Sequence, residues 1–295
     1  MAHPFQVDSR GIRIRKTLIA LGEAVARYTR FEFDEGAGKP AGAALYVVNH
    51  GFGGALDLNA LLSACISARL GLRPEDPCVM LMHQLAWSLG VGQRLEPAGV
   101  RPAGREVALE ALRANVPVIV MPGGDLDGAK PWRRRNRVHF HGRTGFARLA
   151  QEAGVPIVPI VITGAGDTLV NLTDGARLAH ALRLDERLRM KALPIGFALP
   201  WGLNVGIAFG GYLPIPAKMR GTVCRHFTVD PGEDPASVAR QVEAEMDATA
   251  QRLAAGRNPY LDWLTRPGRW NRRPEPGPET RFSAGTRAAL RGAAA

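Results

Sequence analysis

Hydrophobic positions along this chain follow two different periods, and their alternation predicts an α/β protein. Short apolar runs typical of buried strands occupy 43–48, 78–82, 117–121, 155–162 and 222–229, with a further short strand expected near 91–95. Helical spacing covers 12–32, 56–70, 83–89, 104–115, 142–153 and 235–255. Strands that alternate with helices favour a mostly parallel central sheet flanked by helices.

The same pattern divides the chain into three parts. Residues 1–40 form an N-terminal amphipathic helix segment, 41–265 the main α/β domain, and 266–295 a basic tail that is expected to be disordered, because it is rich in proline, glycine and arginine. The N-terminal helix has two interpretations. It either packs on the core or lies as a basic amphipathic helix on a membrane surface.

One stretch of 26 residues, 192–217, contains no charged residue. Four prolines and five glycines within it exclude a continuous membrane-spanning helix. It is either a buried lid of loop and strand or a surface that enters lipid or walls an acyl-chain pocket. Its aromatic residues, including Trp201 and Phe209, stand beside cations such as Lys191 and Lys218, which suits a headgroup boundary.

Charge and composition narrow the possible partners. Lys and Arg total 38 against 27 Asp and Glu, which suits nucleic acid, an anionic membrane surface or a phosphate-bearing substrate. The three cysteines show no CxxC spacing, so a reducing cytosolic setting fits. The N-terminus lacks the apolar core of a signal peptide. The seven histidines form no HExxH pair, so no metal site is expected.

The first candidate for chemistry lies where the strand at 43–48 ends. The chain passes through Asn49 and His50, crosses a glycine-rich turn and reaches Asp57. Strand ends are where α/β proteins place reactive groups. A histidine that takes a proton and an aspartate that orients it form a minimal general-base site. The chain has no GxSxG elbow and no Walker A loop.

The second candidate follows the strand at 117–121. Pro122-Gly123-Gly124 leaves a bare backbone that a ligand can approach. Between Asp127 and Glu152 there is no acid, while seven positive groups are present: Lys130, Arg133, Arg134, Arg135, Arg137, Arg143 and Arg148. A solvated basic loop is the alternative, but the position after a strand-end glycine pair favours phosphate binding.

Three blocks in this order resemble the phospholipid/glycerol acyltransferase superfamily. They are Asn49-His50 with Asp57, Met121-Pro122-Gly123-Gly124, and the Val-Pro block at 155–160. Together with Gly142–Ala150 they are most similar to the lysophospholipid-acyltransferase and diacylglycerol-acyltransferase-2-like branches, over residues of about 40–230. The resemblance implies a glycerol-phosphate-acyltransferase-like α/β fold on a peripheral membrane protein.

The resemblance also implies roles for individual residues. His50 is the expected catalytic base and Asp57 its partner, although six residues separate them here instead of the family's four. The glycines permit a bulge in the loop that would keep the contact. Arg101 corresponds to the arginine of the family's second block. The expected substrate-binding residues are Arg101, Gly123, Gly124, Asp125, Lys130 and Arg133. No cofactor and no metal are expected.

The predicted function is transfer of a fatty acyl group from acyl-CoA, or from acyl carrier protein, to a hydroxyl of a lysophospholipid or glycerolipid. The expected partners are acyl-CoA, a lipid acceptor and an anionic membrane surface, at the cytoplasmic inner face of the cell membrane and without nucleic acid. Two alternatives remain. One is a basic nucleic-acid-binding protein, which predicts salt-sensitive binding to DNA or RNA. The other is a lipid-binding member of the family without catalysis.

Overall fold

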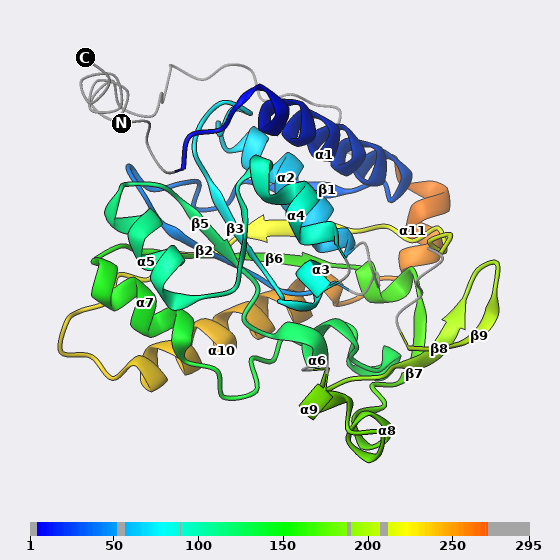
Figure 1. The fold of residues 1–295 in the computed structure, drawn as a ribbon. Helices are drawn as coiled ribbons and strands as arrows, with labels where there is room; N and C mark the ends of the chain where they lie inside the picture. Colours follow the sequence, from blue (N-terminus) through cyan, green and yellow to red (C-terminus); the bar gives the residue numbers. More distant parts are fainter. Residues whose placement is uncertain are drawn as a thin grey trace.

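A seven-stranded sheet forms the centre of the computed structural model, which describes residues 5–51, 57–88, 90–187, 190–206, 212–268 and Trp270. The strands lie in the order β1-β10-β6-β2-β5-β3-β4 (Figure 1). Their bounds are β1 Glu32–Asp34, β2 Leu45–Val48, β3 Val79–Met82, β4 Val100–Pro102, β5 Val118–Val120, β6 Ile157–Thr163 and β10 Arg220–Val223.

Most of this sheet is parallel. Strands β6, β2, β5, β3 and β4 all pair in parallel, while β10 runs antiparallel to β6 and carries β1 at the edge. Every residue of β6 is buried, as expected for a strand with helices on both faces. The predicted fold class, a mostly parallel central sheet flanked by helices, is confirmed.

Two helical layers cover the sheet. Helices α1 (Ser9–Tyr28) and α2 (Leu58–Arg69) lie on one face, and α5 (Arg105–Arg113), α7 (Gly145–Ala153) and α10 (Pro235–Ala254) lie on the other (Figure 1). Neighbouring strand residues alternate between the two cores: Val47 packs with the α5 side and Val48 with the α2 side. Asp234 caps the start of α10, as its sequence position predicts.

One predicted strand is wrong. Residues Val91–Leu95 form the short helix α4, which follows α3 (Leu85–Ser88). Gly90 precedes α4 with a left-handed φ of 73°, and a Cβ on Gly92 would lie 2.4 Å from the Trp87 ring. A short apolar run between glycines carries no periodicity of its own, so tertiary packing decided its structure.

The remaining elements are short. They are α6 (Gly124–Gly128), α8 (Ala176–Ala181), α9 (Leu184–Arg187), α11 (Pro259–Thr265) and the 3₁₀ turns η1 (Glu96–Ala98), η2 (Trp132–Arg134) and η3 (Ala165–Asp167). The predicted strand over 222–229 is shorter than expected, since β10 ends at Val223 and Phe227 forms only an isolated bridge with Ile157.

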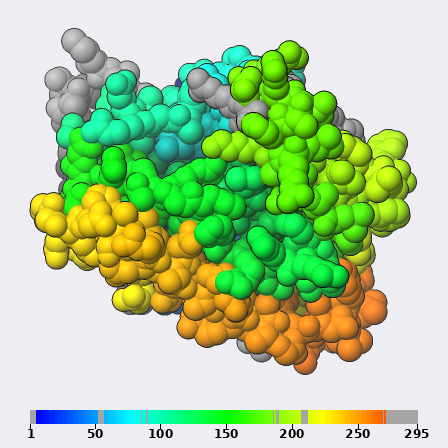
Figure 2. All heavy atoms as spheres, turned by 90° about the horizontal axis from the view of Figure 1, so that it is seen from below, coloured from blue at the N-terminus to red at the C-terminus, as the bar shows by residue number. Residues whose placement is uncertain are grey.

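A second, antiparallel sheet is formed by β7 (Val170–Thr173), β8 (Ile195–Ala198) and β9 (Gly202–Val205). Figures 1 and 2 show these strands with α8 and α9 as a lobe at one end of the molecule. The uncharged stretch 192–217 therefore supplies two strands of this lobe; its residues 207–211, with Phe209, lie outside the described part of the chain.

The two ends of the domain pack on the core. Helix α1 lies along α2, and Gly22 of α1 stands where a Cβ would meet the Leu61 carbonyl oxygen at 2.4 Å. Of the predicted basic tail, only residues 266–268 and Trp270 are described, and Trp270 is buried against Phe31 with a ring separation of 5.5 Å. Within the described ranges, none of the helices is both long and apolar enough to cross a membrane.

Candidate active site

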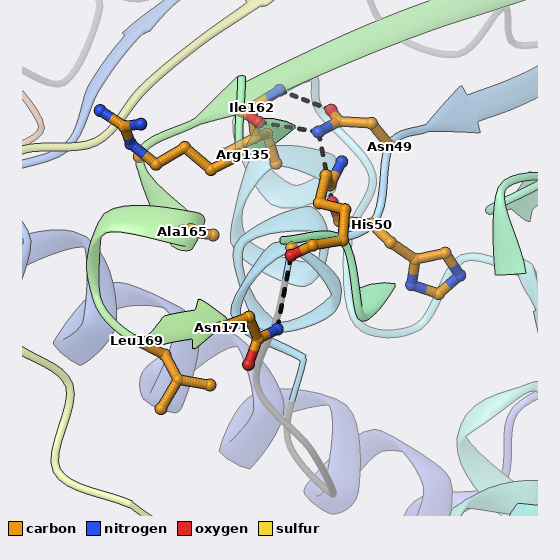
Figure 3. Close-up of a pocket in the computed structure, with 11 residues that line it drawn as sticks. Asn49, His50, Arg135, Ile162, Ala165, Leu169 and Asn171 are labelled. Atoms are coloured by element: carbon orange, nitrogen blue, oxygen red, sulfur yellow. Dashed lines mark hydrogen bonds between the residues drawn. The ribbon is translucent and has the colours of Figure 1, made fainter. Parts of the chain in front are cut away.

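The end of β2 is fixed to its neighbour by a side chain. Asn49, the residue after the strand, donates its amide to the Ile162 carbonyl and accepts the Ile162 N–H, both at 2.8 Å (Figure 3). The Asn59 amide of α2 in turn donates to the Asn49 carbonyl at 2.9 Å. Asn49 is buried, so these bonds are shielded from water. They hold the backbone rigidly at the residue before His50.

His50 and Asp57 meet despite their unusual spacing. One Asp57 oxygen, Oδ1, accepts the N–H groups of Asn59 and Ala60 at 2.8 and 3.2 Å and so caps the start of α2. The other, Oδ2, lies 2.8 Å from His50 Nδ1. The glycine turn between them, residues 52–56, lies outside the described residues. The helix cap thus aims Asp57 at His50.

The surroundings of His50 favour its protonated form. Burial lowers the pKa of the ring, but the hydrogen bond and charge of Asp57 and the charge of Asp127 raise it more, so the pKa lies above its usual value of 6.5. About a quarter of the side chain is exposed, at 24%. No described residue is hydrogen-bonded to Nε2. With Nδ1 facing a carboxylate, Nε2 is the nitrogen that accepts a proton.

A buried carboxylate, that of Asp127, binds the backbone of His50. Asp127 accepts the His50 backbone N–H at 3.0 Å and binds Lys130 Nζ at 2.7 Å, with only 1% of its side chain exposed. Gly123 makes room for it, since a Cβ there would lie 2.3 Å from the Asp127 Cβ. Asp127 was not among the predicted site residues. Its spacing of three from Lys130 was the one available signal.

A pocket opens beside this group of residues. His50 and Lys130 line it together with Asn171 of β7, which is buried. The other lining residues are Asn49, Gly51, Arg135, Ile162, Gly164, Ala165, Gly166 and Leu169. Figure 3 shows that Asn171 approaches from the β7 side, opposite the strand end that carries His50. Nothing in the sequence marked Asn171, because its role depends on how the small sheet folds back.

Arg135 lines the pocket but directs its charge elsewhere. Its Nε donates to Asp167 Oδ1 at 2.5 Å, and its guanidinium stacks 3.8 Å from the centre of the Trp132 ring. Figure 3 shows the guanidinium pointing away from His50. Lys130, with 12% of its side chain exposed, is the lining cation whose charge acts on the pKa of His50.

The other predicted binding residues lie outside the pocket. Asp125 accepts the Lys191 N–H at 2.5 Å, and Arg101 on β4 donates to the Glu96 carbonyl at 2.6 Å. Gly124 has a left-handed φ of 58° and its N–H is 3.4 Å from the Met121 oxygen. Arg133 is exposed on η2. The structure thus brings together His50, Asp57 and Lys130, with Gly123 behind them, and leaves the other four apart.

The arrangement of His50, Asp57 and Lys130 has the groups that general-base chemistry requires. A histidine held by a carboxylate can take a proton from a hydroxyl, and the lysine beside it can hold an anionic group. Among the described residues, no cluster of three or more His, Cys, Asp or Glu side chains could bind a metal ion. Fold and site together define an α/β protein with a histidine–aspartate pair at the carboxyl end of a parallel strand.

Comparison with known proteins shows what this chain is similar to. A family model described as Acyltransferase matches residues 30–163, which contain His50, Asp57 and Lys130. The fold is similar to that of the 1-acyl-sn-glycerophosphate acyltransferase PlsC from Thermotoga maritima, with a TM-score of 0.51 and 15% identity over 82% of this chain and 81% of that one. No curated protein matches the chain. The family model covers less than half of the 295 residues, and the likeness to the solved structure is one of fold.

Proposed function

We propose that this enzyme moves a fatty acyl group from a thioester, acyl-CoA or acyl carrier protein, to a hydroxyl of a lysophospholipid or glycerolipid. The observation that carries the proposal is the 2.8 Å contact between His50 Nδ1 and Asp57 Oδ2. It supports a catalytic member of the family over a purely lipid-binding one, because a binding site has no need of an oriented base.

The proposed reaction uses His50 twice. Nε2 takes the hydroxyl proton as the acceptor oxygen attacks the thioester carbonyl, and the resulting imidazolium is stabilised by Asp57. When the tetrahedral intermediate collapses, the carbon–sulfur bond breaks and Nε2 returns the proton to the departing thiolate. The acyl group passes directly to the acceptor, so no covalent enzyme intermediate is needed.

Lys130 is the proposed anion-binding residue of the pocket. Its ammonium group is hydrogen-bonded to Asp127 and to the Arg137 carbonyl at 2.9 Å, which holds it in place beside His50. It can attract either a phosphate of the acceptor or the developing oxyanion. The exposed arginines of the 133–148 region would add longer-range attraction for the phosphates of the donor. The place of action that fits these substrates is the cytoplasmic face of the cell membrane.

The direct test replaces the base. We expect His50→Ala to abolish acyl transfer from labelled acyl-CoA, or labelled acyl carrier protein, to a panel of lysophospholipids and diacylglycerol. His139→Ala is the matched control, because His139 lies against Glu243 of α10 at 2.9 Å and does not line the pocket. Substantial transfer by the His50 variant, with a normal melting curve, would rule out the mechanism.

A second variant isolates the aspartate's charge. Asp57→Asn keeps a good helix N-cap, so we expect the free energy of unfolding to change by less than about 1 kcal/mol. Because asparagine neither fixes the tautomer nor stabilises the imidazolium, acyl transfer should fall at least about tenfold. Wild-type rates in this variant would mean that another group orients His50.

A further inference from the structure

The outer face of the small sheet presents large apolar side chains to solvent. Phe197 is 46% exposed, Leu203 70% and Val205 55%. Phe197 pairs with Leu203 and Ile195 with Val205, which places these side chains together on one face of the β8–β9 hairpin. Trp201, in the turn between the two strands, is 62% exposed. We refer to Phe197, Trp201, Leu203 and Val205 as the hairpin surface.

The opposite face of the same sheet belongs to the candidate active site. Gly196 and Ala198 alternate with Phe197 and are buried. Gly196 pairs with Asn171 of β7, and Asn171 lines the pocket with His50. Because side chains alternate across a strand, this thin sheet has the pocket on one side and the hairpin surface on the other.

Positive charge adjoins the hairpin surface. The described part of the connection from β7 to β8 carries four exposed cations, and none of them forms an ion pair with a described acid. The four are Arg177, Arg183, Arg187 and Lys191. The stretch from 192 to 217 contains no acid at all. Apolar and aromatic side chains beside unpaired cations are the combination that a headgroup boundary of anionic lipid accommodates.

A second copy of the chain fits this surface less well. A stable dimer buries roughly 800 Å² on each partner through about 20–30 residues, whereas the hairpin surface comprises four side chains at the edge of a protruding lobe (Figure 1). Two copies meeting there would also bring their cations close together. A bilayer needs only a few side chains that enter to a depth of about 5–10 Å.

We propose that the hairpin surface docks this protein onto an anionic lipid bilayer, with the cations of the β7–β8 connection on the headgroups. Docking there would hold the small sheet, and with it the His50 pocket, close to the bilayer that contains the lipid acceptor. This consequence for catalysis rests on the proposed function, whereas the docking of the hairpin surface on the bilayer is independent of it.

The first experiment is flotation with vesicles of phosphatidylcholine, with and without phosphatidylglycerol. We expect the double variant Trp201→Ser, Leu203→Ser to bind anionic vesicles at least about tenfold more weakly than the wild type. Leu21→Ser is the matched control, since Leu21 is 47% exposed on α1 and tests the alternative that α1 lies on the membrane. Unchanged flotation of the double variant, or an equal loss in the control, would overturn the proposal.

Two further measurements keep the proposal testable if the double variant folds poorly. Arg177→Glu with Arg183→Glu should remove the preference for anionic vesicles while leaving weak binding to phosphatidylcholine. Brominated lipids should quench wild-type tryptophan fluorescence, and Trp201→Phe should remove most of that quenching while flotation persists. Quenching that survives in Trp201→Phe, or an anionic preference that survives the charge reversal, would place the contact elsewhere.

Acylation assays separate this proposal from the proposed function. With the acceptor in vesicles, the double variant should lose activity in parallel with its binding. With a short-chain acceptor dispersed below its micelle concentration, it should keep the wild-type rate within about twofold. A wild type that floats but transfers no acyl group would leave the docking intact and refute the function. A wild-type dimer that the double variant dissociates, without flotation, would assign the surface to a second copy.

Discussion

At the scale of single residues, the site depends on carboxylates that each serve two partners. Asp57 divides its oxygens between the start of α2 and the His50 ring. Asp127 divides its own between the His50 backbone and Lys130. The base is therefore fixed through both its ring and its main chain. This geometry reduces the motion that a reacting group would have to lose before proton transfer.

The pH dependence of catalysis tests the electrostatics of His50. General-base action needs neutral imidazole, so kcat/KM should rise with pH and level off above the raised pKa of His50. Asp57 raises that pKa, and Asp57→Asn should therefore move the rising limb to lower pH even though the plateau rate falls. The measurement is kcat/KM between about pH 5 and pH 9 for both proteins. A limb that stays in place would show that Asp57 does not set the protonation of the base.

The sequence predicted which residues belong to the candidate site better than it predicted which of them are in contact. His50, Asp57 and Lys130 stood out because a strand end and a reversal of charge mark them along the chain. Asp127 and Asn171 could not be predicted from the sequence. Their contacts depend on how α6 and β7 fold back toward β2. Arg101 is a residue that the motif order predicted at the site but that the structure places elsewhere. Its strand, β4, lies at the edge of the sheet.

At the scale of elements, close packing of α1 on α2 favours the core-packing interpretation of the N-terminal helix. Gly22 allows the approach, since its hydrogen faces the Leu61 carbonyl and the Cys65 side chain. Arg15 of α1 is buried as well, and its guanidinium donates to the carbonyls of Ala98 and Cys78 at 2.8 Å. The helix is thus held by its glycine and by one buried cation as well as by apolar contacts.

Replacing this glycine tests the packing. Glycine to alanine normally stabilises a helix interior, but Gly22→Ala places a methyl group 2.4 Å from the Leu61 oxygen. We expect the free energy of unfolding to fall by about 1–3 kcal/mol in a urea titration. Gly145→Ala, at the open first turn of α7 with nothing within 4 Å, is the control and should be neutral or slightly stabilising. Equal effects at both positions would contradict the close contact.

At the scale of the whole molecule, residues far apart in sequence close the α1–α2 side of the core. Trp270 is buried against Phe31, and the Arg69 guanidinium lies 4.1 Å from the centre of its ring. Arg69 also donates to the Trp270 carbonyl at 2.7 Å. Composition placed Trp270 in the basic tail, because prolines and arginines dominate the surrounding sequence. A single buried aromatic residue does not change that composition.

Removal of this anchor should lower global stability. We expect Trp270→Ala to reduce the free energy of unfolding by about 3 kcal/mol, through lost apolar burial and the cavity left beside Phe31. Trp201→Ala is the matched control, because Trp201 is 62% exposed and its loss should change stability by less than about 0.5 kcal/mol. Chemical denaturation monitored by circular dichroism compares the two. A Trp270 variant as stable as the wild type would show that the core closes without it.

The sequence by itself determined the class of fold, most of the main elements and the candidate for the base, because hydrophobic period, caps and motif order are local properties of the chain. Tertiary structure decided which of those residues meet. It set the 2.8 Å contact of His50 with Asp57 across six intervening residues, and it placed Asn171 in the pocket that His50 lines. It also resolved the uncharged stretch, whose residues alternate between a buried face and an exposed one. Hydropathy does not distinguish those faces, because the partner that covers one of them comes from elsewhere in the chain.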